Sequence, residues 1–199
     1  MARGGLVEAT SLVELSAILK RSGPFWLFGS QTRVSPADGA ELVKVGVTGF
    51  THLSPADLVC VVGAGTPISW LNQELENSGL TVGCRTDGGT VGGAVSTDGN
   101  WRRWVLGMTI VRADGSIARC GSRVVKSVAG YDAHKLFIGS RGAFGAIAEV
   151  ALRLTTVKSE LNPASRDAEL NATEQMLYQR AKDIFDPTRK LNPGALGLV

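Results

Sequence analysis

The sequence predicts an α+β fold, and three observations lead to this prediction. Segments with helical spacing of apolar residues are interspersed with short runs of the strand type. Glycine accounts for 25 of the 199 residues and gathers in loops between apolar runs. The 44% hydrophobic and 20% charged content is ordinary for a soluble globular protein. The length suits one domain, or one domain of two lobes, with a sizeable core.

The first part of the chain is predicted to hold one helix and three strands. Residues 10–23 are predicted to form an amphipathic helix. Ser11 can serve as its N-cap, with Glu14 three residues later as the second member of a capping box. Gly23 and Pro24 end this helix. Apolar runs then predict strands at residues 25–28, 41–47 and 57–65.

The second part begins with the clearest helix, residues 66–79, with Thr66 as N-cap and Pro67 at its first position. Asp114-Gly115 between two apolar runs predicts a β-hairpin. Further along the chain we expect a short helix after the segment GYDA and a strand at residues 146–154. A polar linker is predicted at residues 156–172. The last helix is predicted to begin after Thr173 as its N-cap, and the tail that follows is predicted to be extended.

Charge and cysteine content exclude several classes of function. The net charge of +3 is small and scattered, so we expect no nucleic-acid partner. The three cysteines lie far apart without a CxxC pair, which argues against a metal site and fits a reducing, cytoplasmic location. There is no apolar leader and no run of about 18 apolar residues, so we expect no membrane insertion.

Three glycine-containing loops could carry chemistry: residues 29–32, 88–99 and 139–145. Glycine lets the backbone approach a ligand closely and offer N–H groups to anionic oxygens. A helix N-terminus after such a loop also favours phosphate. Each loop alone is equally well explained as a tight turn, but the three together suggest a large, phosphate-bearing ligand. The segment GAGTPI, which follows a predicted strand, lacks the third glycine of the dinucleotide-binding fingerprint GxGxxG. The phosphate-binding motif GxxxxGK[ST] does not occur in the sequence.

The spaced motifs GGTVGGAVSTDG, KSVAGYD and GSRGAFGAI, followed by FDPTRKLNPG, make the interpretation specific. Together they resemble the FAD-binding PCMH-type domain of the vanillyl-alcohol oxidase/p-cresol methylhydroxylase superfamily. Within it, the FAD-binding subunit of bacterial glycolate oxidase is most similar. The resemblance covers most of residues 25–155 and again about 173–194. It implies two lobes, about 1–60 and 61–155, that clamp FAD between them, with the C-terminal helix and tail at 173–199 packed against them.

The resemblance also implies roles for individual residues. The loop that holds the FAD pyrophosphate corresponds here to Gly29, Ser30, Gln31 and Thr32. The loop along the flavin corresponds to Asp87, Gly88, Gly89, Thr90, Gly92, Gly93, Ser96 and Thr97. The AGYD turn contributes Gly130 and Tyr131, and the last FAD-contacting motif corresponds to Gly139, Ser140, Gly142, Gly145 and Ile147. The pyrophosphate loop contains no histidine, so FAD is expected to be non-covalent. Members of the superfamily usually carry a large cap, or substrate, domain before the C-terminal motif, whereas here only residues 156–172 occupy that place.

These features leave several functions open. The first is a non-covalent FAD flavoprotein, an oxidoreductase or a subunit of one, whose substrate groups come from a partner subunit or a homodimer mate. The second is a non-catalytic FAD-binding subunit, and the third is a relative that no longer binds FAD. No catalytic residue is assigned. The two histidines, His52 in a predicted loop and His134 in the short helix, are interpreted as surface or packing residues.

Overall fold

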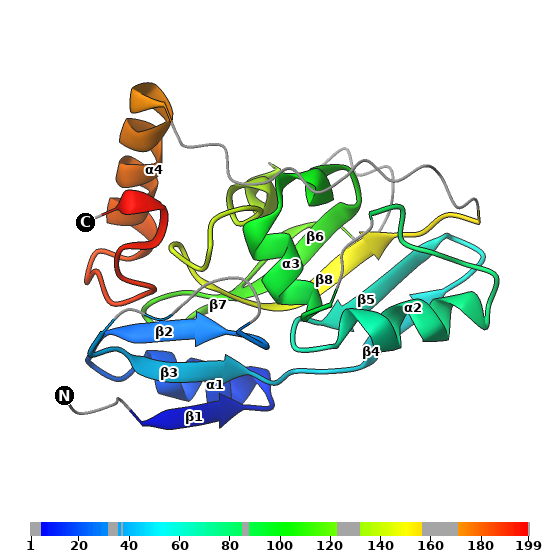
Figure 1. The fold of residues 1–199 in the computed structure, drawn as a ribbon, viewed down its shortest axis with the longest axis horizontal. Helices are drawn as coiled ribbons and strands as arrows, with labels where there is room; N and C mark the ends of the chain where they lie inside the picture. The colour runs from blue at the N-terminus through cyan, green and yellow to red at the C-terminus, as the bar shows by residue number, and fades with distance from the viewer. Residues whose placement is uncertain are drawn as a thin grey trace.

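The structure is a computed structural model that describes residues 5–31, 36, 38–84, 88–122, 132–156 and 171–198. It is an α+β fold with two sheets (Figure 1). The first sheet is parallel, in the order β1-β3-β2, and consists of β1 (Leu6–Ala9), β3 (Glu41–Val45) and β2 (Phe25–Phe28). The second sheet is antiparallel, in the order β4-β5-β8-β6-β7, and consists of β4 (Phe50–Ser54), β5 (Val59–Gly63), β8 (Ala146–Arg153), β6 (Val105–Val111) and β7 (Ile117–Gly121).

The sheets divide between Val45 and Phe50, earlier in the chain than the boundary near residue 60 that the sequence suggested. The segment between them runs close beside the end of β5, where Gly63 N–H donates to Gly49 O and Gly65 N–H donates to Val47 O. A Cβ on Gly63 would lie 2.3 Å from Val47 O, so the glycine allows this close approach. The second sheet therefore begins at β4, directly after the crossing.

The helices are α1 (Leu12–Leu19), α2 (Ile68–Glu76), α3 (Val91–Thr97) and α4 (Ala172–Phe185), with 3₁₀ turns at Gly99–Arg103, Ala133–Leu136 and Ala195–Gly197. Ser11 caps α1 as expected, because its hydroxyl accepts from Glu14 N–H. The other two expected caps are wrong. Pro67 is the N-cap of α2, and the Thr66 hydroxyl accepts instead from Gly49 N–H at 2.9 Å. Asn171, not Thr173, caps α4, in a complete capping box with Glu174.

Three elements did not follow from the sequence. β1 is a four-residue strand whose pairing with β3 outweighs its weak local signal. β4 holds His52, which we expected in a loop, and is an edge strand with an irregular register beside it. α3 lies inside the glycine-rich stretch that we expected to be a loop. Tertiary contacts therefore override the low helix propensity of its two glycines.

The predicted hairpin is present. β6 and β7 pair antiparallel, and Gly115 adopts a φ of 78° in the turn. The turn packs on the first lobe, because the buried Ser16 hydroxyl of α1 donates to Gly115 O at 2.6 Å. This contact is one of the places where α1 is fixed to the second sheet.

The C-terminal tail extends the parallel sheet before it turns away. Leu191 forms a parallel bridge with Phe25 of β2, Phe25 N–H donates to Lys190 O, and Asn192 N–H donates to Phe25 O. The tail is thus extended beside β2 as expected, but it ends in a 3₁₀ turn. The Lys190 ammonium donates to Leu19 O and Arg21 O at the end of α1. A cation in this position suits the C-terminal end of a helix.

His134 is a buried packing residue in the 3₁₀ turn before β8, and its Nδ1 has no hydrogen-bond partner among the described residues. Burial lowers the pKa of His134 below its ordinary value, although Asp132 and the Val105 carbonyl act in the opposite direction. The folded protein therefore binds fewer protons than the unfolded chain just below pH about 6.5.

We expect stability to fall as the pH drops below about 6.5, with a slope of at most about 1.4 kcal/mol per pH unit from this group. Urea unfolding between about pH 5 and 7.5 measures the slope. His134→Gln should flatten it. His52→Gln, at an exposed position on β4, serves as the matched control. A slope that is the same in wild type and His134→Gln would contradict this interpretation.

Candidate cofactor site

A cleft lies between the end of β2, the helix α3 and the loop that leads into β8. It encloses about 690 Å³, open solvent at its mouth included. Its lining comes from both lobes and from the C-terminal tail. The lining residues are Trp26, Leu27, Phe28, Gly29, Ser30, Gln31, Val45, Ala64, Thr90, Gly92, Gly93, Ser96, Thr97, Arg141, Gly142, Gly145, Ala146, Ile147 and Asn192.

The structure brings together most of the residues that the sequence singled out. Those that line the cleft are Gly29, Ser30, Gln31, Thr90, Gly92, Gly93, Ser96, Thr97, Gly142, Gly145 and Ile147. Four others lie near it without lining it: Gly88, Gly89, Gly139 and Ser140. The remaining four, Thr32, Asp87, Gly130 and Tyr131, lie outside the described residues.

At Gly29 the two lobes approach each other closely within the cleft. A Cβ built on Gly29 would lie 2.0 Å from Thr90 Oγ1 and 3.0 Å from both Thr90 Cβ and Thr90 Cγ2. Real Cβ atoms do not approach other atoms so closely, so any larger residue here requires a shift of the Thr90 side chain or of one lobe. The absence of a side chain at this position therefore sets the distance between the loop after β2 and the start of α3.

The first turn of α3 does not offer its N–H groups in the way we expected from the glycine-rich sequence. Val91 N–H donates to Thr66 O, Gly92 N–H donates to Ala64 O, and Gly93 N–H donates to the Thr90 hydroxyl at 3.2 Å. These three N–H groups therefore have protein acceptors, whereas the sequence suggested a glycine-rich loop that offers N–H groups to anionic oxygens. The glycines instead allow close packing, since a Cβ on Gly92 would lie 2.7 Å from Ala64 Cβ.

The loop at residues 139–145 is fixed to the other end of α3. Gly139 N–H donates to Val95 O, and Arg141 N–H donates to Ser96 O at 2.7 Å. Ser140 is fully buried, and its hydroxyl donates to Phe137 O. We therefore assign Ser140 a role in the loop structure and not in the lining of the cleft.

The structure adds several lining residues that we had not singled out. Most are apolar neighbours of the predicted positions: Trp26, Leu27, Phe28, Val45, Ala64 and Ala146. Arg141 and Asn192 are the polar additions, and Arg141 is the one cation among the described lining residues. Asn192 belongs to the LNPG segment, whose resemblance to a C-terminal motif was the one signal that could have indicated it.

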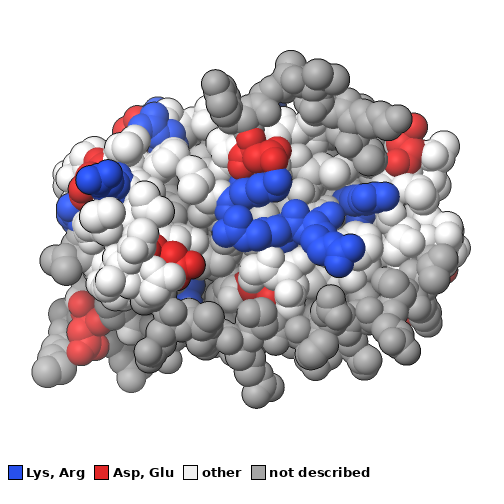
Figure 2. Space-filling view, turned by 90° about the horizontal axis from the view of Figure 1, so that it is seen from above, with Lys and Arg blue, Asp and Glu red and all other residues white. Residues whose placement is uncertain are grey.

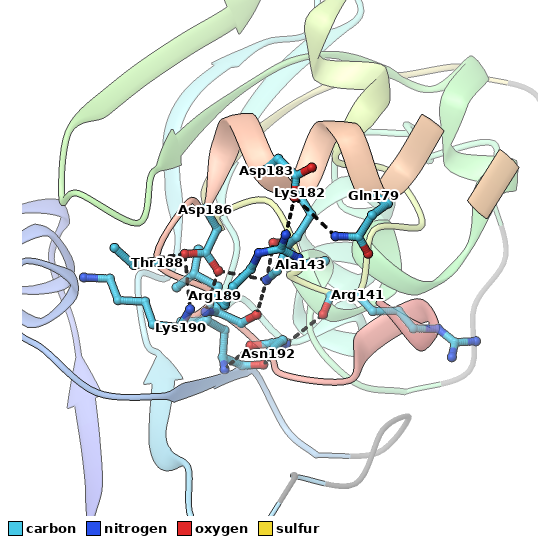
Figure 3. A network of polar contacts seen from close by, with 12 residues as sticks. Arg141, Ala143, Gln179, Lys182, Asp183, Asp186, Thr188, Arg189, Lys190 and Asn192 are labelled. Atoms are coloured by element: carbon cyan, nitrogen blue, oxygen red, sulfur yellow. Dashed lines mark hydrogen bonds and ion pairs between the residues drawn. The ribbon is translucent and has the colours of Figure 1, made fainter. Parts of the chain in front are cut away.

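A buried network connects the cleft to α4 (Figure 3). The Lys182 ammonium donates to Ala143 O at 2.9 Å, to Leu191 O at 2.6 Å and to Asp186 Oδ2 at 2.8 Å. Asp186 also accepts from the N–H groups of Leu191 and Lys190. Burial lowers the pKa of Lys182, although the neighbouring Asp186 acts in the opposite direction. The three protons of the ammonium thus each have an acceptor, as a buried charge requires.

Aromatic contacts complete the packing of α4 on the same loop. The Phe144 ring stacks on Tyr178 with centroids 5.6 Å apart, and Phe137 meets Phe185 edge-on at 5.5 Å. Such pairs add about 0.5–1.5 kcal/mol beyond the buried area. The last helix is therefore held against the loop that borders the cleft by both polar and apolar contacts.

The described lining contains no side chain suited to proton transfer. None of its residues is His, Asp, Glu, Lys, Tyr or Cys. Cys60, Cys84 and Cys120 form no disulfide. Burial raises the pKa of Cys60 to about 12 and that of Cys120 to about 11, so these two thiols are unreactive at neutral pH. Within the described ranges no group of three or more His, Cys, Asp or Glu could hold a metal ion. The described lining is thus suited to holding a ligand and contributes no acid–base group.

Charge on the outer surface is uneven. Seen from above, Lys and Arg side chains form a connected band across the middle of the molecule, with acidic groups near its edges (Figure 2). Arg102 and Arg103 are exposed in the 3₁₀ turn after α3. In the part of the chain that the structure describes, no helix has the length and apolar character needed to cross a membrane.

Comparison with known proteins gives consistent results. The family model "FAD binding domain" matches residues 4–121. The glycolate oxidase subunit GlcE of Escherichia coli is 28% identical over 72% of this chain and 45% of its own length. The mitochondrial D-lactate dehydrogenase (cytochrome) 1 of Saccharomyces cerevisiae is 35% identical over 66% of this chain and 23% of its own length.

A D-lactate dehydrogenase of Archaeoglobus fulgidus is 28% identical over 96% of this chain and 46% of its own length. The chain thus spans less than half the length of each of these relatives. Among solved structures, an alkyldihydroxyacetonephosphate synthase superposes with a TM-score of 0.61 at 14% identity, over 76% of this chain and 32% of that chain. At this identity the likeness concerns the fold alone.

Proposed function

The chain belongs to the FAD binding domain family, and from this premise we propose that it is the FAD-holding part of an oxidoreductase acting on 2-hydroxy acids. FAD is its cofactor, and its α+β fold is of the PCMH type, as the sequence motifs indicated. The activity is the proposal. It is supported by relatives named as a glycolate oxidase subunit and as D-lactate dehydrogenases, whose names describe those proteins.

The observation that carries the proposal is the cleft itself. Its walls come from separate parts of the chain and bring glycine backbone to the ligand space at Gly29, Gly93, Gly142 and Gly145. Such walls suit a large, elongated cofactor, because the missing side chains leave room for close contact. The apolar lining beside β2 suits the flat rings of a dinucleotide, and Arg141 provides one positive charge for its diphosphate.

The residues present therefore fit FAD, and their roles divide by position. We assign contact with the diphosphate to the loop at 29–31 and to Arg141, and contact along the rest of the cofactor to Thr90, Ser96 and Thr97. The Thr97 hydroxyl donates to Gly93 O at 2.8 Å, so this hydroxyl is oriented by the helix. When bound, the flavin supplies the redox chemistry, and the protein supplies position and electrostatic environment. The described chain orients the cofactor and narrows the access of water.

We propose that the groups that bind the 2-hydroxy acid and move its protons come from outside this cleft. The described lining has none of them, and residues 154–171 alone separate β8 from α4. A partner subunit or a second copy of this chain is the expected source. The basic band in Figure 2 would attract a carboxylate substrate or an acidic partner. The three free cysteines favour a reducing compartment, the cytoplasm.

The alternative, a non-catalytic FAD-binding subunit, is supported by the same absence of proton-transfer groups from the described lining. Anaerobic reduction of the bound flavin separates the two. The purified protein, loaded with FAD, is mixed with glycolate or D-lactate, first alone and then with the chains that co-purify with it.

We expect bleaching of the flavin absorption only when the co-purifying chains, or a dimer at high protein concentration, complete the site. A flavin that stays oxidised with both substrates under all these conditions would contradict the oxidoreductase proposal and favour the non-catalytic subunit. A chain that takes up no FAD at all would exclude both.

A further inference from the structure

Asn192 occupies an unusual place for a residue of a C-terminal tail, because it is buried in the wall of the cleft. Its side chain is 3% exposed and joins three segments that are distant in sequence. Its Oδ1 accepts from Leu27 N–H at 2.7 Å, and its Nδ2 donates to Leu27 O at 3.3 Å and to Arg141 O at 2.7 Å. The amide is thus fully used by backbone groups of both walls.

The contact with Leu27 continues the sheet by means of a side chain. Up to Leu191 the tail pairs with β2 as a parallel strand, through Phe25. At Asn192 the backbone leaves the strand with a φ of 39°, a left-handed conformation that Asn tolerates better than most residues. Its side-chain amide then takes the place of the next peptide unit and pairs with both polar groups of Leu27. The end of β2 is therefore held although the tail has turned away.

The contact with Arg141 fixes the opposite wall. Arg141 has a φ of 51° and is followed by Gly142, with a φ of 77°. A Cβ on Gly142 would lie 2.6 Å from Asn192 Nδ2, so the Asn192 side-chain amide packs directly against this loop. In Figure 3 the Arg141 side chain runs away from the network while its carbonyl meets Asn192. The loop at 141–145 and the segment at 27–31 are thus tied to one another by a single side chain.

We propose that Asn192 is a positioning residue for FAD: it sets the spacing between the loop after β2 and the loop at 141–145, so that both contact the cofactor at once. The inference rests on the proposed function in one respect, namely that this cleft holds FAD. The buried Lys182–Asp186 pair supports the arrangement, because it binds Leu191 on one side and Ala143 on the other. The tail is thus fixed in the wall of the cleft through Asn192.

The test compares Asn192→Gly with Ser16→Ala. Glycine accepts the left-handed backbone, so Asn192→Gly deletes the amide without adding strain. Ser16→Ala deletes one buried hydrogen bond, from Ser16 to Gly115 O, at a site away from the cleft. Both variants are expected to lose stability, because each leaves a buried hydrogen-bond partner unsatisfied. FAD dissociation constants are measured well below the melting temperature of either apoprotein.

We expect Asn192→Gly to raise the Kd for FAD by about tenfold or more, mainly through faster dissociation, and Ser16→Ala to leave it within about twofold of wild type. Equal Kd values for Asn192→Gly and wild type would overturn the proposal. An equal rise in both variants would also overturn it, because general loss of stability would then be the cause.

A second variant keeps the test decisive if Asn192→Gly fails to fold. Asn192→Asp retains the acceptor for Leu27 N–H and nearly the same volume, but it loses the donor to Arg141 O and places a carboxylate beside two carbonyls. We expect weakened FAD binding, and unchanged binding would count against the proposal. Failure of the wild type to bind FAD would instead refute the placement of FAD in this chain, which distinguishes the two claims.

Discussion

Gly29→Ala is expected to raise the Kd for FAD by about 30-fold or more, although it adds a single methyl group. The added Cβ would lie 2.0 Å from Thr90 Oγ1, so the loop at 29–31, the start of α3 or the Thr90 side chain, whose hydroxyl accepts from Gly93 N–H, must move. All three border the cleft. A loss of about 2 kcal/mol of contact energy with the cofactor corresponds to a change of this size in Kd. Equilibrium titration of the apoprotein with FAD, followed by flavin fluorescence, gives the Kd.

Gly99→Ala is the matched control for this prediction. Gly99 lies in the same glycine-rich stretch, but a Cβ there meets nothing within 4 Å. FAD binding by Gly99→Ala should equal that of wild type. The double variant Gly29→Ala/Thr90→Ala removes the clashing hydroxyl and should recover part of the affinity, which a double-mutant cycle would report as coupling. Retention of FAD by Gly29→Ala at the level of Gly99→Ala would contradict the close contact between the two lobes.

Lys182→Met is expected to cause the largest loss of stability, about 3–5 kcal/mol. The substitution leaves the Asp186 carboxylate, which is fully buried, without its counter-charge, and it leaves the carbonyls of Ala143 and Leu191 without that donor. For a chain of this size such a loss lowers the melting temperature by about 10 °C or more. Thermal unfolding and urea unfolding of the apoprotein measure it.

Lys135→Met provides the comparison. Lys135 also pairs with an aspartate, Asp132, but both side chains are largely exposed, and such pairs are worth about 0–1 kcal/mol. We expect its melting temperature to stay close to wild type. If Lys182→Met were as mild as Lys135→Met, the buried pair would not hold α4 and the tail, and the support for the position of Asn192 would be lost.

Local signals in the sequence correctly indicate many of the elements. Ser11 caps α1, Asp114-Gly115 forms the hairpin turn, and the runs around β2, β5 and β8 are strands. These features depend on neighbours in sequence, so propensity and turn chemistry are sufficient. The glycine-rich motifs also indicate the position of the cleft, because segments of the chain approach one another there too closely for a side chain at several of these glycines.

Features that depend on distant contacts could not be predicted. α3 forms in a glycine-rich segment because Thr90 caps it and Ala64 packs against Gly92. The pairing of Asn192 with Leu27 spans 165 residues, and nothing in the tail sequence indicates that partner. The same applies to the first-turn N–H groups of α3, which bind the protein acceptors Thr66 O, Ala64 O and the Thr90 hydroxyl. In each case a deciding contact comes from outside the local segment: from Ala64 and Thr66 for α3, and from Leu27 for Asn192.

Hydrogen–deuterium exchange of the apoprotein with and without FAD tests the central claim most directly, because it reports where the cofactor lies. We expect FAD to slow exchange in peptides that cover residues 26–31, 90–97 and 141–147, which line the cleft. Peptides that cover β4 at residues 50–54 should exchange at the same rate in both samples. Saturable FAD binding that leaves the three lining segments unprotected, or that protects a different surface, would contradict the placement of FAD in this cleft.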